Sequence, residues 1–187
     1  MRKLFAHLPN LITLARLAMA PLAVGLILSQ RFGAAFAVFV VAGVSDGIDG
    51  YIAKRFRLTT ELGAHLDPLA DKVLIDAIYV TLASIGQLPP WLAILIVSRD
   101  ATILAAMILA WLMSRPFAIR PTLISKLNTV AQIAFAAFLL GSRAFGFAAP
   151  FAHLSFVVLV TFSTLASGLV YIGQWLDPSS RRKGTPP

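Results

Sequence analysis

Long apolar runs alternate with short polar connections along almost the whole chain. Each run is close to the roughly 20 residues that a helix needs to cross a bilayer. The pattern predicts six spans, at Leu11–Leu28, Ala35–Ala53, Pro68–Ile85, Trp91–Met113, Thr122–Leu140 and Ala152–Trp175. We therefore expect an all-α integral membrane protein with six transmembrane helices in one bundle.

The two ends of the chain differ from this apolar centre. Residues 2–9 combine two cations with large apolar side chains, a composition that suits a short helix lying on the membrane surface. The last residues are polar and typical of a disordered tail. The expected organisation is a juxtamembrane helix at 1–9, a six-helix domain at 10–176 and a cytoplasmic tail at 177–187.

Composition strengthens the membrane interpretation. Of the 187 residues, 58% are hydrophobic and only 13% are charged, whereas charged residues make up roughly 25% of ordinary soluble domains. The chain has no cysteine, which excludes a disulfide, a thiolate nucleophile or a cysteine-ligated metal from any mechanism.

The positions of the basic residues predict an orientation and explain the net charge of +8. With six spans, both termini lie on one side, together with eleven Lys and Arg residues at or beyond the ends of the spans, while the other side holds Arg31 and Arg143. The side with more cations is cytoplasmic. Since membrane topology accounts for the charge, we expect membrane lipids and no nucleic acid as partners.

The acidic residues are concentrated in one region of the chain. Six of the eight fall between Asp46 and Asp76, and at least four of these belong to the cytoplasmic ends of the second and third predicted spans. Asp46 and Asp49 are spaced i, i+3, and Asp67 and Asp71 are spaced i, i+4, so each pair shares a helix face. The connection between the two spans is short, and we expect the four carboxylates to converge in one cleft at the membrane surface.

Four carboxylates in one partly dehydrated cleft repel one another unless divalent cations compensate them. Ligands that are all oxygen favour Mg²⁺, Mn²⁺ or Ca²⁺ over Zn²⁺, and a pair of metal ions suits displacement at phosphorus. Helix capping is an alternative for Asp67, since Pro68 follows it as a first helical residue would. A cation transporter is an alternative of another class, in which the carboxylates bind the transported ion.

The same residues resemble a family signature. Asp46-Gly-Ile-Asp49-Gly50-Tyr-Ile-Ala53-Lys54, eight further residues, and Gly63-Ala-His-Leu-Asp67-Pro-Leu-Ala-Asp71 are similar to D-x2-D-G-x2-A-R-x8-G-x3-D-x3-D of the CDP-alcohol phosphotransferases. The one departure is Lys54, where the family has arginine. Lys54 keeps the positive charge, and Arg55 follows it. Either Lys54 or Arg55 could therefore contact the diphosphate.

The resemblance implies roles for the signature residues. Mg²⁺ or Mn²⁺ is held by Asp46, Asp49, Asp67 and Asp71, and Asp71 also takes the proton of the attacking hydroxyl. CDP is bound by Asp46, Asp49, Gly50, Ala53, Lys54, Arg55, Gly63 and Asp67. The small residues among these let the helices approach a nucleotide closely. The resemblance also implies a homodimer.

Motifs outside the signature bear on the acceptor alcohol. Asn10, Thr13 and Arg16 resemble the family's N-terminal motif, and the stretches around Arg99 and Lys126 are most similar to eukaryotic-type cardiolipin synthases, with the phosphatidylglycerophosphate synthases as near relatives. We expect these five residues to bind the acceptor: Asn10, Thr13 and Arg16 because of the resemblance, and Arg99 and Lys126 because ionisable groups in or beside membrane spans are functional candidates. The resemblance implies that CDP-diacylglycerol reacts with phosphatidylglycerol, giving cardiolipin, or alternatively with glycerol 3-phosphate.

Two further expectations complete the interpretation. An intramembrane prenyltransferase also binds diphosphate through aspartates, but its two motifs are expected on distant spans of a longer chain. No Arg- and Ser-rich transit peptide precedes the first predicted span, so we expect a bacterial inner membrane.

Overall fold

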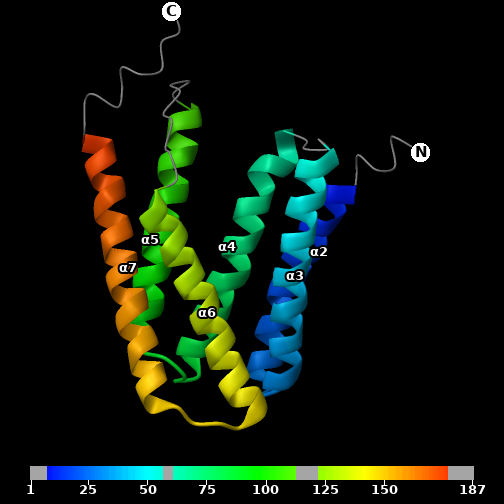
Figure 1. Ribbon diagram of the computed structural model, residues 1–187, viewed down its shortest axis with the longest axis vertical. Helices are drawn as coiled ribbons and strands as arrows, with labels where there is room; N and C mark the ends of the chain where they lie inside the picture. The colour runs from blue at the N-terminus through cyan, green and yellow to red at the C-terminus, as the bar shows by residue number, and fades with distance from the viewer. Residues whose placement is uncertain (1–7, 57–60, 113–121, 177–187) are drawn as a thin grey trace, which may run out of the picture. The chain divides into compact units, whose positions relative to one another are not determined.

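The computed structural model describes residues 8–56, 61–112 and 122–176. These residues form helices and no strands (Figure 1). The helices are 21 to 27 residues long, which confirms the all-α prediction. They are α2 (Leu8–Leu28), α3 (Phe32–Phe56), α4 (Glu61–Ser84), α5 (Pro90–Leu112), α6 (Leu123–Phe145) and α7 (Pro150–Leu176).

Several helix boundaries differ from the sequence prediction. Helix α4 begins at Glu61 rather than Pro68, so Asp67 lies inside the helix and the interpretation of Asp67 as its N-cap is wrong. Helix α2 begins at Leu8, within the predicted surface helix, of which residues 1–7 lie outside the described part. The backbone hydrogen-bond ladder of a helix does not stop where its apolar run stops, and polar turns extend it.

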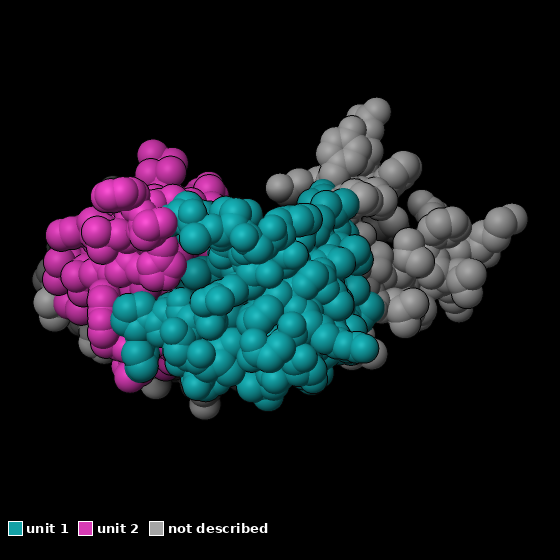
Figure 2. Space-filling view, turned by 90° about the horizontal axis from the view of Figure 1, so that it is seen from below, with its two compact units in different colours: residues 1–90, 136–149 teal, residues 91–135, 150–187 magenta. Residues whose placement is uncertain are grey.

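The chain divides into two compact units, coloured separately in Figure 2. Unit 1 comprises residues 1–90 and 136–149, and therefore holds α2, α3, α4 and the second half of α6. Both α3 and α4 pack against α2. Its core includes Ala23, Ile27, Ile78 and Tyr79, which are fully buried.

Unit 2 comprises residues 91–135 and 150–187, with α5, the first half of α6, and α7. Leu92, Ile96 and Val160 are buried in it, and the Phe135 ring of α6 stacks on Phe156 of α7 at 5.4 Å between centroids. The predicted single bundle concerns the arrangement of the two units and stays a prediction.

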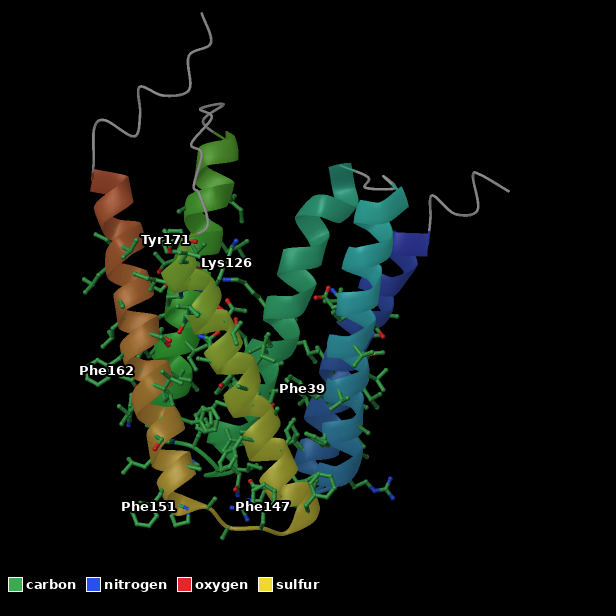
Figure 3. The ribbon with its side chains drawn as sticks, in the orientation of Figure 1. Phe39, Lys126, Phe147, Phe151, Phe162 and Tyr171 are labelled. Carbon is green, nitrogen blue, oxygen red and sulfur yellow. The ribbon has the colours of Figure 1, made fainter. Side chains whose placement is uncertain are left out.

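Among the described residues, two helices combine the length and the apolar composition that a membrane span needs. They are α6 and residues Pro150–Gly173 of α7; Ala15–Leu28 and Phe32–Gly47 are apolar but shorter. Only 22% of the most apolar window of α7 is buried, and large side chains such as Phe151, Phe162 and Leu169 are exposed on it (Figure 3 labels the two phenylalanines). A helix with so much exposed apolar surface fits hydrocarbon better than water.

A buried ion pair lies in unit 2. Arg99 Nη1 donates to Asp100 Oδ1, and both side chains are only 5% exposed. Removing two charges from water costs several kcal/mol per ion, and their mutual attraction offsets that cost only when both partners remain. Loss of the carboxylate alone therefore leaves a buried cation without its counter-charge.

We predict that Asp100→Leu destabilises the protein by about 3–5 kcal/mol, and that adding Arg99→Met restores most of the loss because no charge then remains buried. Thermal unfolding of the purified protein in detergent measures this. Ser98→Ala is the matched control, since Ser98 is an exposed polar neighbour on the same helix. A double variant no more stable than Asp100→Leu would contradict the explanation.

Candidate functional site

The four signature aspartates lie on two helices of unit 1. Helix α3 continues through Phe56, so Asp46 and Asp49 share one of its faces, and Asp67 and Asp71 share a face of α4. Both helices pack against α2. The predicted helical spacing of each pair is thus confirmed. Convergence of the four carboxylates stays a prediction, because Asp46 is the one whose side chain the structure describes.

Asp46 forms an ion pair with Arg16 of α2. Arg16 Nη2 lies 2.9 Å from Asp46 Oδ1, a charge-assisted hydrogen-bond distance. The two side chains differ in environment, since Arg16 is 4% exposed and Asp46 is 47% exposed. The pair therefore connects a guanidinium inside the helix packing to a carboxylate that remains open to solvent. The sequence analysis placed Arg16 with the acceptor-binding residues and did not anticipate this contact.

The remaining predicted residues of unit 1 are placed by their backbone alone. Their side chains lie outside the described part of the chain, so the contacts assigned to them stay predictions. Asn10 and Thr13 lie on α2; Asp49, Gly50, Ala53, Lys54 and Arg55 lie on α3; Gly63, Asp67 and Asp71 lie on α4.

The donor set of this region fits a hard divalent cation. The signature supplies carboxylate oxygens, and the chain contains no cysteine, a combination that suits Mg²⁺ or Mn²⁺. Asp46 uses Oδ1 toward Arg16, and a carboxylate has a second oxygen that can bind an ion. No group of three or more acidic or histidine side chains gathers among those whose placement is described, and that set omits three of the four aspartates.

Unit 2 contains a second group of polar side chains, drawn from three helices. Arg99 of α5 donates from Nη2 to Ser125 Oγ of α6 at 2.7 Å and to Ser167 Oγ of α7. Its Cζ lies 5.6 Å from the centre of the Tyr171 ring, within cation–π range. We call Arg99, Asp100, Ser125, Ser167 and Tyr171 the Arg99 cluster. Within the described residues, Arg99 Nε has no hydrogen-bond partner.

Lys126 adds an exposed cation beside this cluster. It follows Ser125 on α6 and its side chain is exposed, and Figure 3 labels Lys126 and Tyr171 on neighbouring helices. Tyr171 also contacts this turn of α6, because its hydroxyl lies 3.4 Å from Ser125 Oγ. Arg99 and Lys126 thus belong to one polar region of unit 2, and their predicted role in acceptor binding stays a prediction.

Asn128 connects α6 to α7 one turn further along. It is fully buried, and its Oδ1 accepts hydrogen bonds from Ser163 Oγ and Thr164 Oγ1, both at 2.8 Å. The sequence analysis did not single out these partners. The available signal was the helical spacing of Thr164, Ser167 and Tyr171, which lie on one face of an otherwise apolar helix.

The chain was compared with known protein families. Residues 6–168 match the family described as CDP-alcohol phosphatidyltransferase. The matched range covers α3 and α4 with the four aspartates, and also the helices that contribute Arg16, Arg99 and Lys126.

Several curated proteins are similar to this chain. It is 33% identical over 180 residues to the cardiolipin synthase (CMP-forming) of Rattus norvegicus, covering 88% of this chain and 60% of the rat protein. It is 37% identical over 179 residues to a cardiolipin synthase (CMP-forming) / mitochondrial hydrolase fusion protein of Schizosaccharomyces pombe, of which it covers 30%.

A bacterial relative matches over nearly its whole length. The CDP-diacylglycerol–glycerol-3-phosphate 3-phosphatidyltransferase of Bacillus subtilis is 33% identical over 185 residues, which is 90% of this chain and 94% of that protein. The chain thus spans 60% or less of the rat and yeast relatives but almost all of the bacterial one. With a family match from residue 6 to residue 168 and these relatives, the chain belongs to the CDP-alcohol phosphatidyltransferase family.

Proposed function

We propose that this protein transfers the phosphatidyl group of CDP-diacylglycerol to an alcohol and releases CMP. The observation that carries the proposal is the signature, which matches at seven of its eight fixed positions and lies on α3 and α4 inside the matched family region. The acceptor hydroxyl oxygen attacks the phosphatidyl phosphorus, the bond from that phosphorus to the bridging diphosphate oxygen breaks, and CMP leaves with the electron pair.

Each signature residue has a role in this reaction. Asp71 takes the proton of the acceptor hydroxyl as the new bond forms. Asp46, Asp49, Asp67 and Asp71 hold Mg²⁺ or Mn²⁺, which, when bound, neutralises the charge of the diphosphate. Lys54 and Arg55 add positive charge beside the nucleotide. Gly50, Ala53 and Gly63 leave room for it, since larger side chains at these positions would fill the space between the helices.

Phosphatidylglycerol is the proposed acceptor, with cardiolipin as the product. The rat and yeast relatives, whose names state cardiolipin synthesis, support this choice. Glycerol 3-phosphate is the second candidate, and the match along 94% of the Bacillus subtilis protein favours it. Both acceptors offer a hydroxyl and a phosphate.

The acceptor phosphate is proposed to bind in unit 2. Arg99 is held by Ser125 and Ser167 with Tyr171 beside it and shares its charge with Asp100, and the exposed Lys126 adds a second cation. Hydrogen bonds to ionised groups contribute roughly 1.5–3 kcal/mol each. The acceptor-binding role that the sequence predicts for Asn10, Thr13 and Arg16 of α2, in unit 1, stays a prediction.

The enzyme is proposed to act at a membrane. The six helices are long enough to cross hydrocarbon, and the excess of Lys and Arg on one side supports cytoplasmic termini and a cytoplasmic active site. A bacterial inner membrane is the proposed location, and a homodimer is the proposed state. The acyl chains of CDP-diacylglycerol would then stay in the bilayer while its headgroup reaches the aspartates.

We predict that Asp71→Asn abolishes CMP release while the variant stays folded, because an amide cannot accept the hydroxyl proton. CMP is measured by chromatography after incubation with CDP-diacylglycerol, acceptor and Mn²⁺, and folding by thermal unfolding. Asp177→Asn, outside the signature, is the control and should keep full activity. An active Asp71→Asn variant would remove the role of this residue.

Mass spectrometry of the lipid product identifies the acceptor. Purified enzyme is given CDP-diacylglycerol with Mg²⁺ or Mn²⁺ and either phosphatidylglycerol or glycerol 3-phosphate. We expect cardiolipin from the first mixture and no phosphatidylglycerophosphate from the second. Phosphatidylglycerophosphate from the second mixture and no cardiolipin from the first would make glycerol 3-phosphate the acceptor, without changing the proposed transfer reaction.

We predict that Lys126→Met raises the KM for the acceptor about tenfold, as loss of one charged hydrogen bond does, while the KM for CDP-diacylglycerol stays unchanged. Steady-state kinetics with each substrate varied in turn separates the two constants. Arg143→Met is the matched control, because Arg143 is another exposed cation on α6. An equal rise in both constants would argue against a specific acceptor site at Lys126.

A further inference from the structure

Among the residues of unit 1 that the structure describes, Arg16 is a buried cation, and it forms an ion pair with Asp46 of the signature. Helix α2, which carries Arg16, packs against both helices that carry the four aspartates. The guanidinium is 4% exposed while the Asp46 carboxylate is 47% exposed. The contact therefore joins Arg16, whose side chain is held by the surrounding helices, to Asp46, whose side chain is about half exposed to solvent.

We propose that Arg16 is a positioning residue for metal binding. Arg16 holds Asp46 through Oδ1 and restricts its rotation, so that the second carboxylate oxygen is available to the divalent cation in one orientation. This inference rests on the proposed function, in which Asp46 is a metal ligand. Hydrogen-bonding partners of metal ligands commonly act in this way, and their loss typically weakens metal binding 10- to 100-fold.

If Arg16 acts through its charge or through positioning, its removal should change the metal affinity in opposite directions. A cation close to a metal site repels the metal ion, so its removal should strengthen metal binding if charge alone matters. If Arg16 orients the carboxylate, its removal should instead weaken metal binding. The carboxylate then rotates freely in the metal-free protein and must lose that freedom when it binds the ion. The direction of the change in metal affinity therefore separates the two explanations.

A third role for Arg16 is purely structural. An ion pair between α2 and α3 with one buried partner affects the stability of the helix packing when the other partner is removed. That role changes the unfolding temperature of the protein but leaves the metal affinity of the folded molecules as it was. Metal affinity measured on folded protein is thus the informative quantity, and it requires no turnover.

The experiment measures Mn²⁺ binding to the full-length protein in lipid nanodiscs without nucleotide. Free Mn²⁺ is followed by electron paramagnetic resonance during titration. Arg16→Met should raise the dissociation constant about tenfold, and Arg16→Lys should raise it severalfold, because lysine keeps the charge but lacks the planar guanidinium. Arg31→Met, which removes an exposed cation at the end of α2, is the matched control and should bind Mn²⁺ as the parent protein does.

An unchanged or lower dissociation constant in either Arg16 variant would overturn the inference. If Arg16→Met does not fold, Arg16→Lys decides by the same criterion. Asp46→Asn tests the proposed function separately, since unchanged Mn²⁺ binding in that variant would remove Asp46 from the ligands. If Asp46→Asn binds Mn²⁺ more weakly while the Arg16 variants bind it as the parent protein does, Asp46 remains a metal ligand and the positioning role of Arg16 is wrong. In the Asp46→Asn background, Arg16→Met should cause no further loss.

Discussion

A charged side chain buried among apolar helices needs a partner of opposite charge, and this requirement arranges the polar residues of both units. An unpaired ion loses its hydration without compensation, whereas a paired one keeps most of its interaction energy. Arg16 meets the requirement with Asp46 in unit 1. Arg99 meets it with Asp100 in unit 2, and adds the hydroxyls of Ser125 and Ser167.

The partners of these arginines also decide which helix faces are turned toward each other. Arg16 contacts the helix after its own, and Arg99 contacts both α6 and α7. Asn128 does the same with neutral groups, since its carbonyl oxygen accepts from two hydroxyls of α7. Apolar packing alone is tolerant of rotation about a helix axis, because lipid tails are as apolar as leucine. The polar contacts therefore supply much of the specificity of the packing.

The sequence was informative where the physical signal is local. Apolar runs predicted the positions of the helices, and spacing on one helix predicted the faces shared by the aspartates. The start of α4 was misplaced because polarity and Pro68 marked the edge of an apolar run, whereas the helix begins at Glu61. The contact of Arg16 with Asp46 joins residues on different helices, and no periodicity within a single helix reports such a pair.

The ion pair in unit 1 bears on how a cluster of carboxylates can exist before metal binds. In the proposed site, four ionised aspartates would repel one another, and this repulsion would oppose the packing of α3 and α4 against α2. Arg16 offsets part of that charge through Oδ1 of Asp46, so this carboxylate can be compensated in the metal-free protein and still offer its second oxygen to an ion. A lysine or arginine on the exposed surface could not do this as well, because solvent screens it and its side chain is not held in place. Burial of Arg16 within the helix packing is thus what allows one residue to support both the fold of unit 1 and the chemistry proposed for it.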